Sequence, residues 1–415
     1  MSEVIKKAAE SKEASVMLAT ASTKQKNDAL LSMAEALQNN QEEILAANAI
    51  DLDNLTKKEG YNKAFYDRLK LTGDRVMGMV EGLRELVALP DPIGEVMGMQ
   101  TRPNGLQVGR VRVPLGVVGI IYEARPNVTA DASGLALKAG NAVLLRGSSE
   151  AIHSNKALVK VLRQAVAAVG LPAGTITLVE ETDRSAVMEM MRLNAYLDVL
   201  IPRGGASLIK SVVENASVPV IETGTGNCHT FVDQSADLQM AEEIAFNAKT
   251  HRPGVCNAME TLLVHKDVAE DFLPGMVQRL TAAGVEVRGC EKTQRSADNV
   301  VAATEEDWYT EYLDMVLAIR VVDSLDEAIL HINKYGSKHS EAIVTSQYHN
   351  ARVFQSHVDA AAVYVNASTR YTDGGEFGLG AEMGISTQKL HARGPMGLTA
   401  LTSTKFIING DGQIR

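Results

Sequence analysis

The sequence has few cysteines, few aromatic residues and no long apolar run. Its three cysteines, Cys228, Cys256 and Cys290, form no CxxC or CxH spacing, which excludes a disulfide scaffold and a zinc site and favours a reducing cytoplasm. Aromatic residues make up 4% of the chain, so nucleic-acid bases would find few side chains on which to stack. No run of about 18 apolar residues occurs, and acidic residues interrupt the N-terminal segment, so we expect neither a membrane span nor a signal peptide.

Basic residues are also in deficit. Lysine and arginine number 41 against 51 aspartate and glutamate, a formal net charge of −10, and no basic stripe could follow a nucleic-acid backbone. The chain has 415 residues, of which 45% are hydrophobic and 22% charged, as in ordinary globular proteins. Its length predicts roughly two to four domains.

The hydrophobic pattern changes along the chain and predicts an α/β protein. Apolar spacing of three to four residues predicts helices over the first 90 residues, and Asn104-Gly105 predicts a hairpin with a two-residue turn within 98–113, weakened by Pro103. Alternating strands and helices then predict a doubly wound sheet over about 115–225. Its expected strands are 117–122, 142–146, 175–179, 197–201 and 218–221.

A second α/β region follows Gly226. We expect a helix over 237–249, a strand over 260–265, a further helix to about 283 and a last strand at 361–366. The final TSTKFIING suits an edge strand that pairs elsewhere.

Cys256 lies in KTHRPGVCNAMETLLVH, after a helix and before a strand. Such a loop can present a sulfur, and the cationic residues Lys249, His251 and Arg252 nearby would favour a reactive thiolate. A buried structural cysteine is the alternative, and it is the interpretation that we keep for Cys228 and Cys290.

Three further segments carry candidate binding groups. Gly204 and Gly205, between a strand and a helix, would let backbone N–H groups approach a phosphate, although an ordinary turn looks the same. Glu222 is either an acid/base group or a solvated rim residue. Asn127 is either a helix cap or a donor to an oxyanion, and Arg146 either contacts a nucleotide phosphate or lies on the surface.

Seven segments in this order resemble the aldehyde dehydrogenase superfamily and, within it, the gamma-glutamyl phosphate reductase family, also called glutamate-5-semialdehyde dehydrogenases. They run from RPN at 125–127 through VLLRGSSEA, LPAGTITLV, LIPRGGASLI, VIETGTGNCH and HRPGVCNAMETLLVH to EFGLGAEMGISTQKLHARGPMGL. The resemblance implies a Rossmann-like cofactor domain at 1–226 and an α/β catalytic domain at 227–366. It also implies a return segment with a terminal strand at 367–415, which forms an oligomerisation arm with the hairpin.

The same resemblance implies roles for single residues. Cys256 matches the catalytic thiol, Asn127 the oxyanion-stabilising amide, and Arg146 a cationic cofactor contact that is usually lysine. Glu222 matches the carboxylate with which hydrolytic members activate water. The residues after it, Thr223-Gly224-Thr225-Gly226, replace the usual Leu-Gly-Gly and so disfavour hydrolysis. Glu222, Gly204 and Gly205 are then expected near the cofactor.

The reaction implied is the NADPH-dependent reduction of L-glutamyl 5-phosphate to L-glutamate 5-semialdehyde through a Cys256 thioester, the second step of proline biosynthesis. The expected partners are this small substrate, further copies of the chain and the glutamate kinase that makes the substrate; nucleic acid and membrane are not expected. Two alternatives stay open: a hydrolytic aldehyde dehydrogenase, which would need no phosphate, and a non-enzymatic nucleotide-binding protein, which would need no activated thiol.

Overall fold

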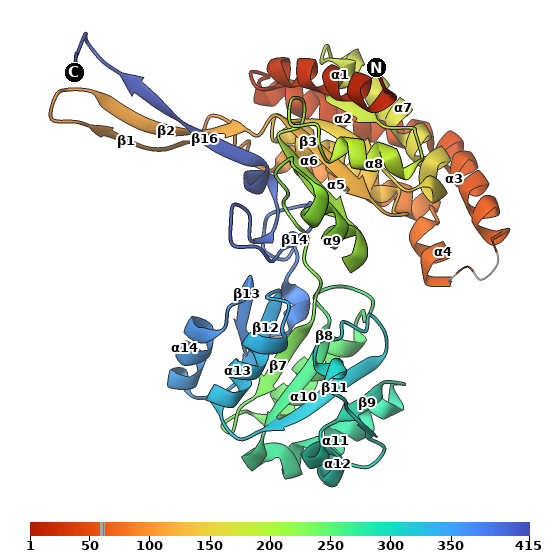
Figure 1. Ribbon diagram of the computed structural model, residues 1–415, viewed down its shortest axis with the longest axis vertical. Helices are drawn as coiled ribbons and strands as arrows, with labels where there is room; N and C mark the ends of the chain where they lie inside the picture. Colours follow the sequence, from red (N-terminus) through yellow and green to blue (C-terminus); the bar gives the residue numbers. More distant parts are fainter. Residues whose placement is uncertain (59–60, 62) are drawn as a thin grey trace. The chain divides into compact units, whose positions relative to one another are not determined.

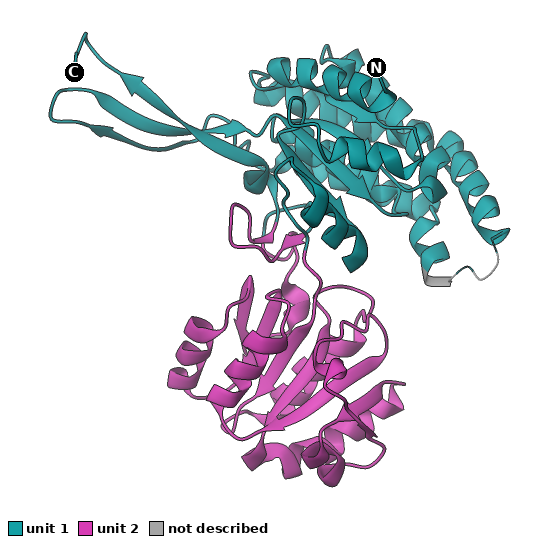
Figure 2. Ribbon diagram, viewed as in Figure 1, with its two compact units in different colours: residues 1–223, 378–384, 396–415 teal, residues 224–377, 385–395 magenta. Residues whose placement is uncertain are grey.

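The computed structural model describes residues 1–58, 61 and 63–415, and the chain divides into two compact units (Figure 2). Unit 1 comprises residues 1–223, 378–384 and 396–415, and unit 2 comprises 224–377 and 385–395. Residues 367–377 and 385–395 therefore group with unit 2, whereas the sequence predicts a return to the cofactor domain after 366. Hydrogen bonds explain part of this difference, because the Asn257 side chain binds the carbonyl of Thr372 at 2.9 Å.

Unit 1 begins with helices, as predicted. They bury Leu30, Met33 and Leu37 at the three-to-four-residue spacing of one helix face, and Ser2, Ser22 and Thr72 cap three of them at the N-terminus. The helices are α1 (Glu3–Leu18), α2 (Thr23–Asn39), α3 (Gln41–Thr56), α4 (Lys63–Leu69) and α5 (Gly73–Ala88).

A four-stranded parallel sheet forms the centre of unit 1 (Figure 1), in the order β5-β4-β3-β6. Its strands are β3 (Val117–Tyr122), β4 (Ala142–Arg146), β5 (Ile176–Leu178) and β6 (Val199–Arg203), and its helices are α6 (Asn127–Lys138), α7 (Ile152–Ala168), α8 (Arg184–Met190) and α9 (Ala206–Asn215). The predicted strand at 218–221 is wrong, because only a single bridge forms there, between Leu200 and Val220. Pro219 has no N–H with which to extend the pairing.

This strand order places the topological switch point between β3 and β6. The chain leaves β3 toward β4 on one side, and β6 later pairs with β3 on the other side. Tyr122 lies opposite Arg203, and Ile121 lies opposite Arg146, so the three strands end at the same edge. In open parallel sheets ligands bind outside this carboxyl edge, at the switch point.

The hairpin and the terminal strand form a separate antiparallel sheet of unit 1, in the order β1-β2-β16 (Figure 1). Its strands are β1 (Val96–Thr101), β2 (Gln107–Pro114) and β16 (Thr402–Asn409). The predicted two-residue turn is wrong: the loop is Pro103–Gly105, closed by Arg102 N–H donating to the Leu106 carbonyl at 2.7 Å, and only Gly105 has a positive φ, of 88°. Pro103 lies in this loop and so does not interrupt the pairing.

Unit 2 contains a seven-stranded parallel sheet in the order β10-β9-β11-β8-β7-β12-β13. Its strands are β7 (Cys228–Val232), β8 (Met259–His265), β9 (Glu286–Gly289), β10 (Val301–Ala302), β11 (Val316–Val322), β12 (Ser340–Val344) and β13 (Ala362–Val365). Its helices are α10 (Leu238–Thr250), α11 (Lys266–Ala282), α12 (Glu291–Ser296), α13 (Leu325–Tyr335) and α14 (Tyr348–His357), and β14 (Ile385–Ser386) pairs with β15 (Gly394–Pro395).

Alternate side chains of the central strands pack on opposite faces of this sheet. Leu262 and Val264 pack with α10 and α11, whereas Leu263 and Phe231 pack with α13 and α14. Both faces are therefore covered, which explains why every residue of β7 and β8 is buried, the polar ones included.

A buried ion pair ties the N-terminal helices to the segment that leads into β1. The Lys26 ammonium lies 2.6 Å from the Asp91 carboxylate, and the two side chains are 1% and 8% exposed. Burial raises the pKa of Asp91, but hydrogen bonds from Lys26, Thr23 and the Ile93 N–H outweigh it and lower the pKa below its ordinary value. The charged form of Asp91 therefore stabilises the folded state above pH 3.8, and this contribution is lost as the pH falls through the lowered pKa.

We predict that Asp91→Asn lowers the free energy of unfolding by about 3 kcal/mol or more, because it leaves the buried Lys26 without its counter-charge. Urea unfolding followed by circular dichroism measures the loss. Asp28→Asn is the control, since its partner Lys24 is 83% exposed, and it should leave the midpoint unchanged. Equal midpoints for the two variants would contradict the role given to Asp91.

Candidate active site

Residues 251–258, here called the thiol loop, connect α10 to β8 in unit 2 and carry Cys256. The side chain of Cys256 is half-buried, whereas Cys228 is buried. The loop precedes the amino end of β8, where a short turn joins the Ala258 N–H to the Val255 carbonyl at 3.1 Å. A helix and a buried strand thus hold both ends of the loop.

The carbonyl group of Cys256 is held by two residues at the start of β7 and just before it. The Cys228 thiol donates to this carbonyl oxygen with a sulfur–oxygen distance of 3.1 Å. Burial, followed by the charge of Glu341, raises the pKa of Cys228 far above its ordinary value, so this thiol keeps the proton that it donates. Gly226 lies against the same carbonyl, and a Cβ atom at this position would stand 1.4 Å from the Cys256 oxygen. Only glycine permits that approach.

Asn257, the next residue of the loop, is held by the segment after β13. Thr369 Oγ1 donates to the Asn257 carbonyl at 2.7 Å, and Asn257 Nδ2 donates to the carbonyls of Thr372 and Arg370 at 2.9 and 3.3 Å. Residues 226–228 and 369–372 therefore hold the Cys256 carbonyl and the residue that follows it. This arrangement suits a nucleophile whose position must not vary.

A buried ion pair joins the two elements that flank the loop. Lys249 Nζ, in α10, lies 2.5 Å from Glu260 Oε2, in β8, and neither side chain is exposed. Burial raises the pKa of Glu260 to about 7 against the opposing effect of Lys249, while Glu260 Oε1 also accepts from the Leu313 N–H at 3.0 Å. Lys249, one of the three nearby cations expected to favour a Cys256 thiolate, therefore has its ammonium paired with Glu260.

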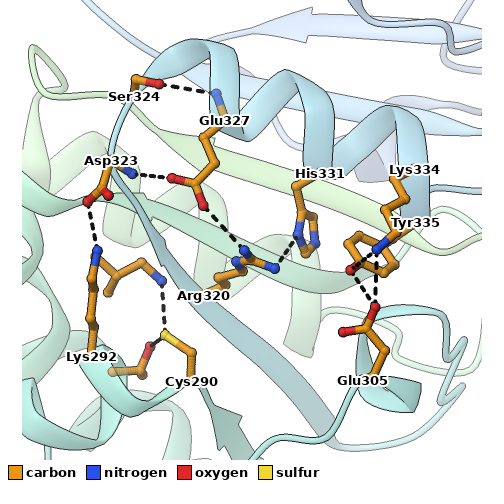
Figure 3. Close-up of polar contacts among 12 residues, drawn as sticks. Cys290, Lys292, Glu305, Arg320, Asp323, Ser324, Glu327, His331, Lys334 and Tyr335 are labelled. Carbon is orange, nitrogen blue, oxygen red and sulfur yellow. Dashed lines mark hydrogen bonds and ion pairs between the residues drawn. The ribbon is translucent and has the colours of Figure 1, made fainter.

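Cys290 lies far from this loop in the sheet. It follows β9, and the β9–β11–β8 register places it level with the carboxyl half of β8, whereas Cys256 precedes the amino end of that strand. Its sulfur contacts Thr293 Oγ1 at 3.3 Å and accepts from the Val321 N–H at 3.4 Å (Figure 3). These contacts support a structural role for Cys290.

The predicted cofactor residues lie along the carboxyl edge of the unit 1 sheet. Gly204 and Gly205 follow β6 and precede α9, but a carboxylate of the chain occupies this turn: the Gly205 N–H donates to Glu123 Oε1 at 2.9 Å. A Cβ at Gly204 would lie 2.6 Å from the Glu123 carboxyl carbon, which explains the glycine. The turn thus receives an anion, and in this structure the anion is Glu123.

Arg146 ends β4 and is 8% exposed, so the surface-arginine alternative is wrong. Its guanidinium donates to the carbonyls of Gly147 at 2.6 Å and Thr182 at 2.7 Å, and burial lowers its pKa. The Nε of Arg146 and the Oγ of Ser148 are buried without a partner among the described residues. These two orphaned polar groups lie at the end of β4 and just after it.

Asn127 is the first residue of α6, and its side chain does not cap the helix. Pro126 occupies the N-cap position without a side-chain hydrogen bond, so the helix-cap alternative is wrong. The Asn127 amide instead donates to Asp131 at 3.0 Å, one turn later. Burial raises the pKa of Asp131 to about 6, although Asn127 and Arg203 oppose the rise.

Glu222 is half-buried in the segment that follows the bridge to β6. The adjacent Thr223 donates to the Pro202 carbonyl at 2.8 Å, which fixes this segment beside the end of β6. Unit 1 therefore gathers Arg146, the glycine turn and Glu222 at one sheet edge, and Cys256 belongs to unit 2.

Comparison with known proteins decides the family. The sequence profile described as "Aldehyde dehydrogenase family" matches residues 1–297. The chain belongs to the aldehyde dehydrogenase family. Among its relatives are proteins named gamma-glutamyl phosphate reductase from Moorella thermoacetica, 63% identical with 100% of this chain and 99% of that protein covered, and from Carboxydothermus hydrogenoformans, 61% identical with both chains fully covered.

Solved members of the family share the fold. The crystal structure of gamma-glutamyl phosphate reductase from Thermotoga maritima matches with a TM-score of 0.98 and 52% identity, covering 100% of both chains. An acetylating aldehyde dehydrogenase from Geobacillus thermoglucosidasius, 17% identical, matches with a TM-score of 0.71 over 100% of this chain and 97% of that one. The predicted aldehyde-dehydrogenase-like α/β fold is confirmed.

Several residues around the thiol were not predicted from the sequence. Gly226, Cys228 and Glu260 stand in segments that resemble the family, but only tertiary contacts show that they and residues 369–372 hold the loop. In the part of the chain that the structure describes, no helix is long and apolar enough to cross a membrane, and no group of three or more histidine, cysteine or acidic residues could hold a metal.

We predict that Gly226→Ala lowers the turnover rate by about 100-fold or more, because the added methyl group must displace the Cys256 carbonyl and with it the Cys256 side chain. Steady-state rates and melting temperatures of the same preparation measure the effect. Gly275→Ala, in α11, is the control, since a Cβ there meets nothing within 4 Å. Full activity of the Gly226 variant would show that the loop tolerates displacement.

Proposed function

We propose that the protein reduces L-glutamyl 5-phosphate to L-glutamate 5-semialdehyde and phosphate, the second step of proline biosynthesis from glutamate. It is an oxidoreductase of the aldehyde dehydrogenase family that uses a nicotinamide cofactor. The observation that carries the proposal is the immobilised Cys256, in a chain related over its full length to proteins named for this substrate.

Cys256 is the proposed nucleophile. Its thiolate attacks the acyl carbon, the bond from carbon to the phosphate oxygen breaks, and a thioester remains on the enzyme. A backbone held at the Cys256 carbonyl and at Asn257 lowers the entropy cost of reaching the attack geometry. The Cys256 N–H and the Asn127 amide are the proposed donors to the oxyanion.

The proposal gives Glu222 no essential role as a base. In a hydrolytic aldehyde dehydrogenase a carboxylate must take a proton from water before water attacks the thioester. Inorganic phosphate is already anionic near neutral pH and attacks without such help. The segment after Glu222, Thr223–Gly226, differs from the Leu-Gly-Gly of hydrolytic members. This difference favours a phosphate-dependent reaction over hydrolysis.

The carboxyl edge of the unit 1 sheet fits a nicotinamide cofactor. The orphaned Arg146 Nε and Ser148 Oγ offer donors, and the turn at Gly204-Gly205 receives a carboxylate where a phosphate would also fit. When bound, the cofactor supplies the hydride that reduces the thioester. We propose NADPH because this is the cofactor of the resembling family, with Arg146, Gly204, Gly205 and Glu222 as contact residues. Glu123 would have to release the Gly205 N–H to admit a phosphate.

Phosphate dependence tests the function. We predict that the protein reduces NADP with glutamate 5-semialdehyde only when phosphate is present, and that Cys256→Ala abolishes this activity while the cofactor still binds, because nothing else replaces the nucleophile. Cys290→Ser is the matched control and should keep the parental rate, since its contacts lie elsewhere. A phosphate-independent rate in the parent, or turnover by the Cys256 variant, would refute the proposal.

We further propose that the β1-β2-β16 sheet binds a second copy of the chain. All six residues of β1 are exposed, and the sheet presents apolar side chains to solvent, including Phe406 at 64% and Ile408 at 60% exposure. Exposed apolar strands with open edges favour pairing with another strand or burial against another surface. A homo-oligomer provides both.

We predict that deleting the residues after Leu401 yields monomers, because the truncation removes β16 and opens the edge of β2. Light scattering of the purified proteins gives the mass. The control is Phe406→Tyr, which keeps the strand and most of the aromatic surface. Retention of the parental oligomeric mass by the truncated protein would exclude the terminal strand from the interface.

Two finer assignments complete the proposal. We propose the cytoplasm as the compartment, because three free thiols suit a reducing environment. We also propose functional coupling with the glutamate kinase that makes the labile acyl phosphate, since direct handover would limit the loss of substrate to water.

A further inference from the structure

Two arginines of unit 2 have a guanidinium with neither a carboxylate nor any other side-chain partner among the described residues. The other arginines of this unit pair with acidic groups, apart from Arg352, which contacts a tyrosine hydroxyl; the paired ones are Arg279, Arg288, Arg295, Arg320 and Arg393. Figure 3 shows Arg320 held between Glu327 and His331. The exceptions are Arg252, in the thiol loop, and Arg370. The Nε of Arg370 is buried and has no hydrogen-bond partner.

The position of Arg370 is fixed beside the thiol loop. It lies in a short 3₁₀ turn, η4 (Thr369–Tyr371), in which Ser368 Oγ accepts from the Arg370 N–H at 3.3 Å. Hydrogen bonds from Thr369 Oγ1 and to the Arg370 carbonyl attach this turn to Asn257, the residue after Cys256. The turn therefore cannot move away from the thiol without losing these bonds.

The charges of Arg252 and Arg370 influence each other, and that of Arg370 also interacts with Cys256. Burial lowers the pKa of Arg370, the charge of Arg252 lowers it further, and Cys256 followed by Asp373 acts in the opposite direction. Arg252, Arg370 and Cys256 thus lie within electrostatic reach of one another. Two like charges with no carboxylate bonded to either carry an energetic cost that an incoming anion would relieve.

We propose that Arg370, assisted by Arg252, binds the phosphoryl group of the acyl phosphate next to Cys256. This inference rests on the proposed function and adds the site for its leaving group. A guanidinium presents two parallel N–H donors that match two oxygens of a phosphoryl group. The phosphorus is two bonds from the acyl carbon that Cys256 attacks, whereas the substrate's own carboxylate is four bonds away, so a cation beside the thiol suits the phosphoryl group.

The step balances without a further reactant. The Cys256 sulfur bonds to the acyl carbon, and the bond from that carbon to the phosphate oxygen breaks with its electron pair on oxygen. The thiol proton ends on the departing group, which leaves as hydrogen phosphate. Arg370 and Arg252 stabilise the charge that develops on the leaving oxygen. In the reverse direction the same groups hold inorganic phosphate for attack on the thioester.

The test measures the Michaelis constant for inorganic phosphate during oxidation of glutamate 5-semialdehyde. We predict that Arg370→Gln raises this constant by about tenfold or more, the loss expected for a charged hydrogen-bond donor, while the constants for NADP and for the semialdehyde change little. Arg370→Lys keeps the positive charge but lacks the two parallel N–H donors, so its phosphate constant should fall between those of the parent and the Gln variant. Arg352→Gln, on the surface of α14, is the matched control and should equal the parent.

Two kinetic results would overturn the inference. One is an unchanged phosphate constant in Arg370→Gln. The other is a rise in the semialdehyde constant alone, which would assign Arg370 to the substrate's carboxylate. If Arg370→Gln fails to fold, Arg252→Gln replaces it, because Arg252 is exposed and accepts substitution, and a normal phosphate constant in that variant counts against the inference equally.

A second measurement separates this inference from the proposed function. Inorganic phosphate should slow the alkylation of Cys256 by iodoacetamide in the parent but not in Arg370→Gln, with the modified cysteine identified by peptide mapping. Protection in both proteins, or in neither, would overturn the site even if turnover depends on phosphate. A parent without phosphate-dependent turnover would instead refute the function, whatever the alkylation shows.

Discussion

The close contact between Gly226 and the Cys256 carbonyl is the constraint on which the rest of the site depends. It brings the thiol loop against the backbone just before β7, and the hydrogen bond from the Cys228 thiol then fixes the direction of the Cys256 carbonyl. Lys249 and Glu260 hold the flanking helix and strand together, and residues 369–372 hold Asn257. The proposed thioester chemistry needs a sulfur held in one position, and these contacts hold the backbone that carries it.

Local sequence predicted the regular elements of the fold well. Strands β3 and β4 begin and end as expected, because each is a short apolar run bounded by residues that turn the chain. The errors have local physical causes. Pro219 prevents the ladder that its apolar neighbours favour, and a three-residue loop takes Pro103 out of the strand and gives Gly105 the positive φ.

The sequence motifs predicted the candidate residues of the site but not the contacts that hold them in place. Cys256 stands out in the sequence, yet the groups that fix it lie in separate segments, from Gly226 and Cys228 to residues 369–372, which lie more than 100 residues beyond Asn257, and no periodicity links them. Nearness in sequence also misled: Lys249 precedes Cys256 closely but pairs with Glu260, whereas the unpaired Arg370 comes from a distant turn. Burial and pairing, not spacing, decide which cation is free to meet a substrate.

The central claim is that Cys256 carries the acyl group during turnover. Intact-protein mass spectrometry after mixing the enzyme with glutamate 5-semialdehyde and NADP in phosphate-free buffer tests it most directly. We expect a glutamyl adduct that maps to Cys256, persists in water and disappears when phosphate is added. An adduct on another residue, no adduct at all, or one that water removes as fast as phosphate does would contradict the account.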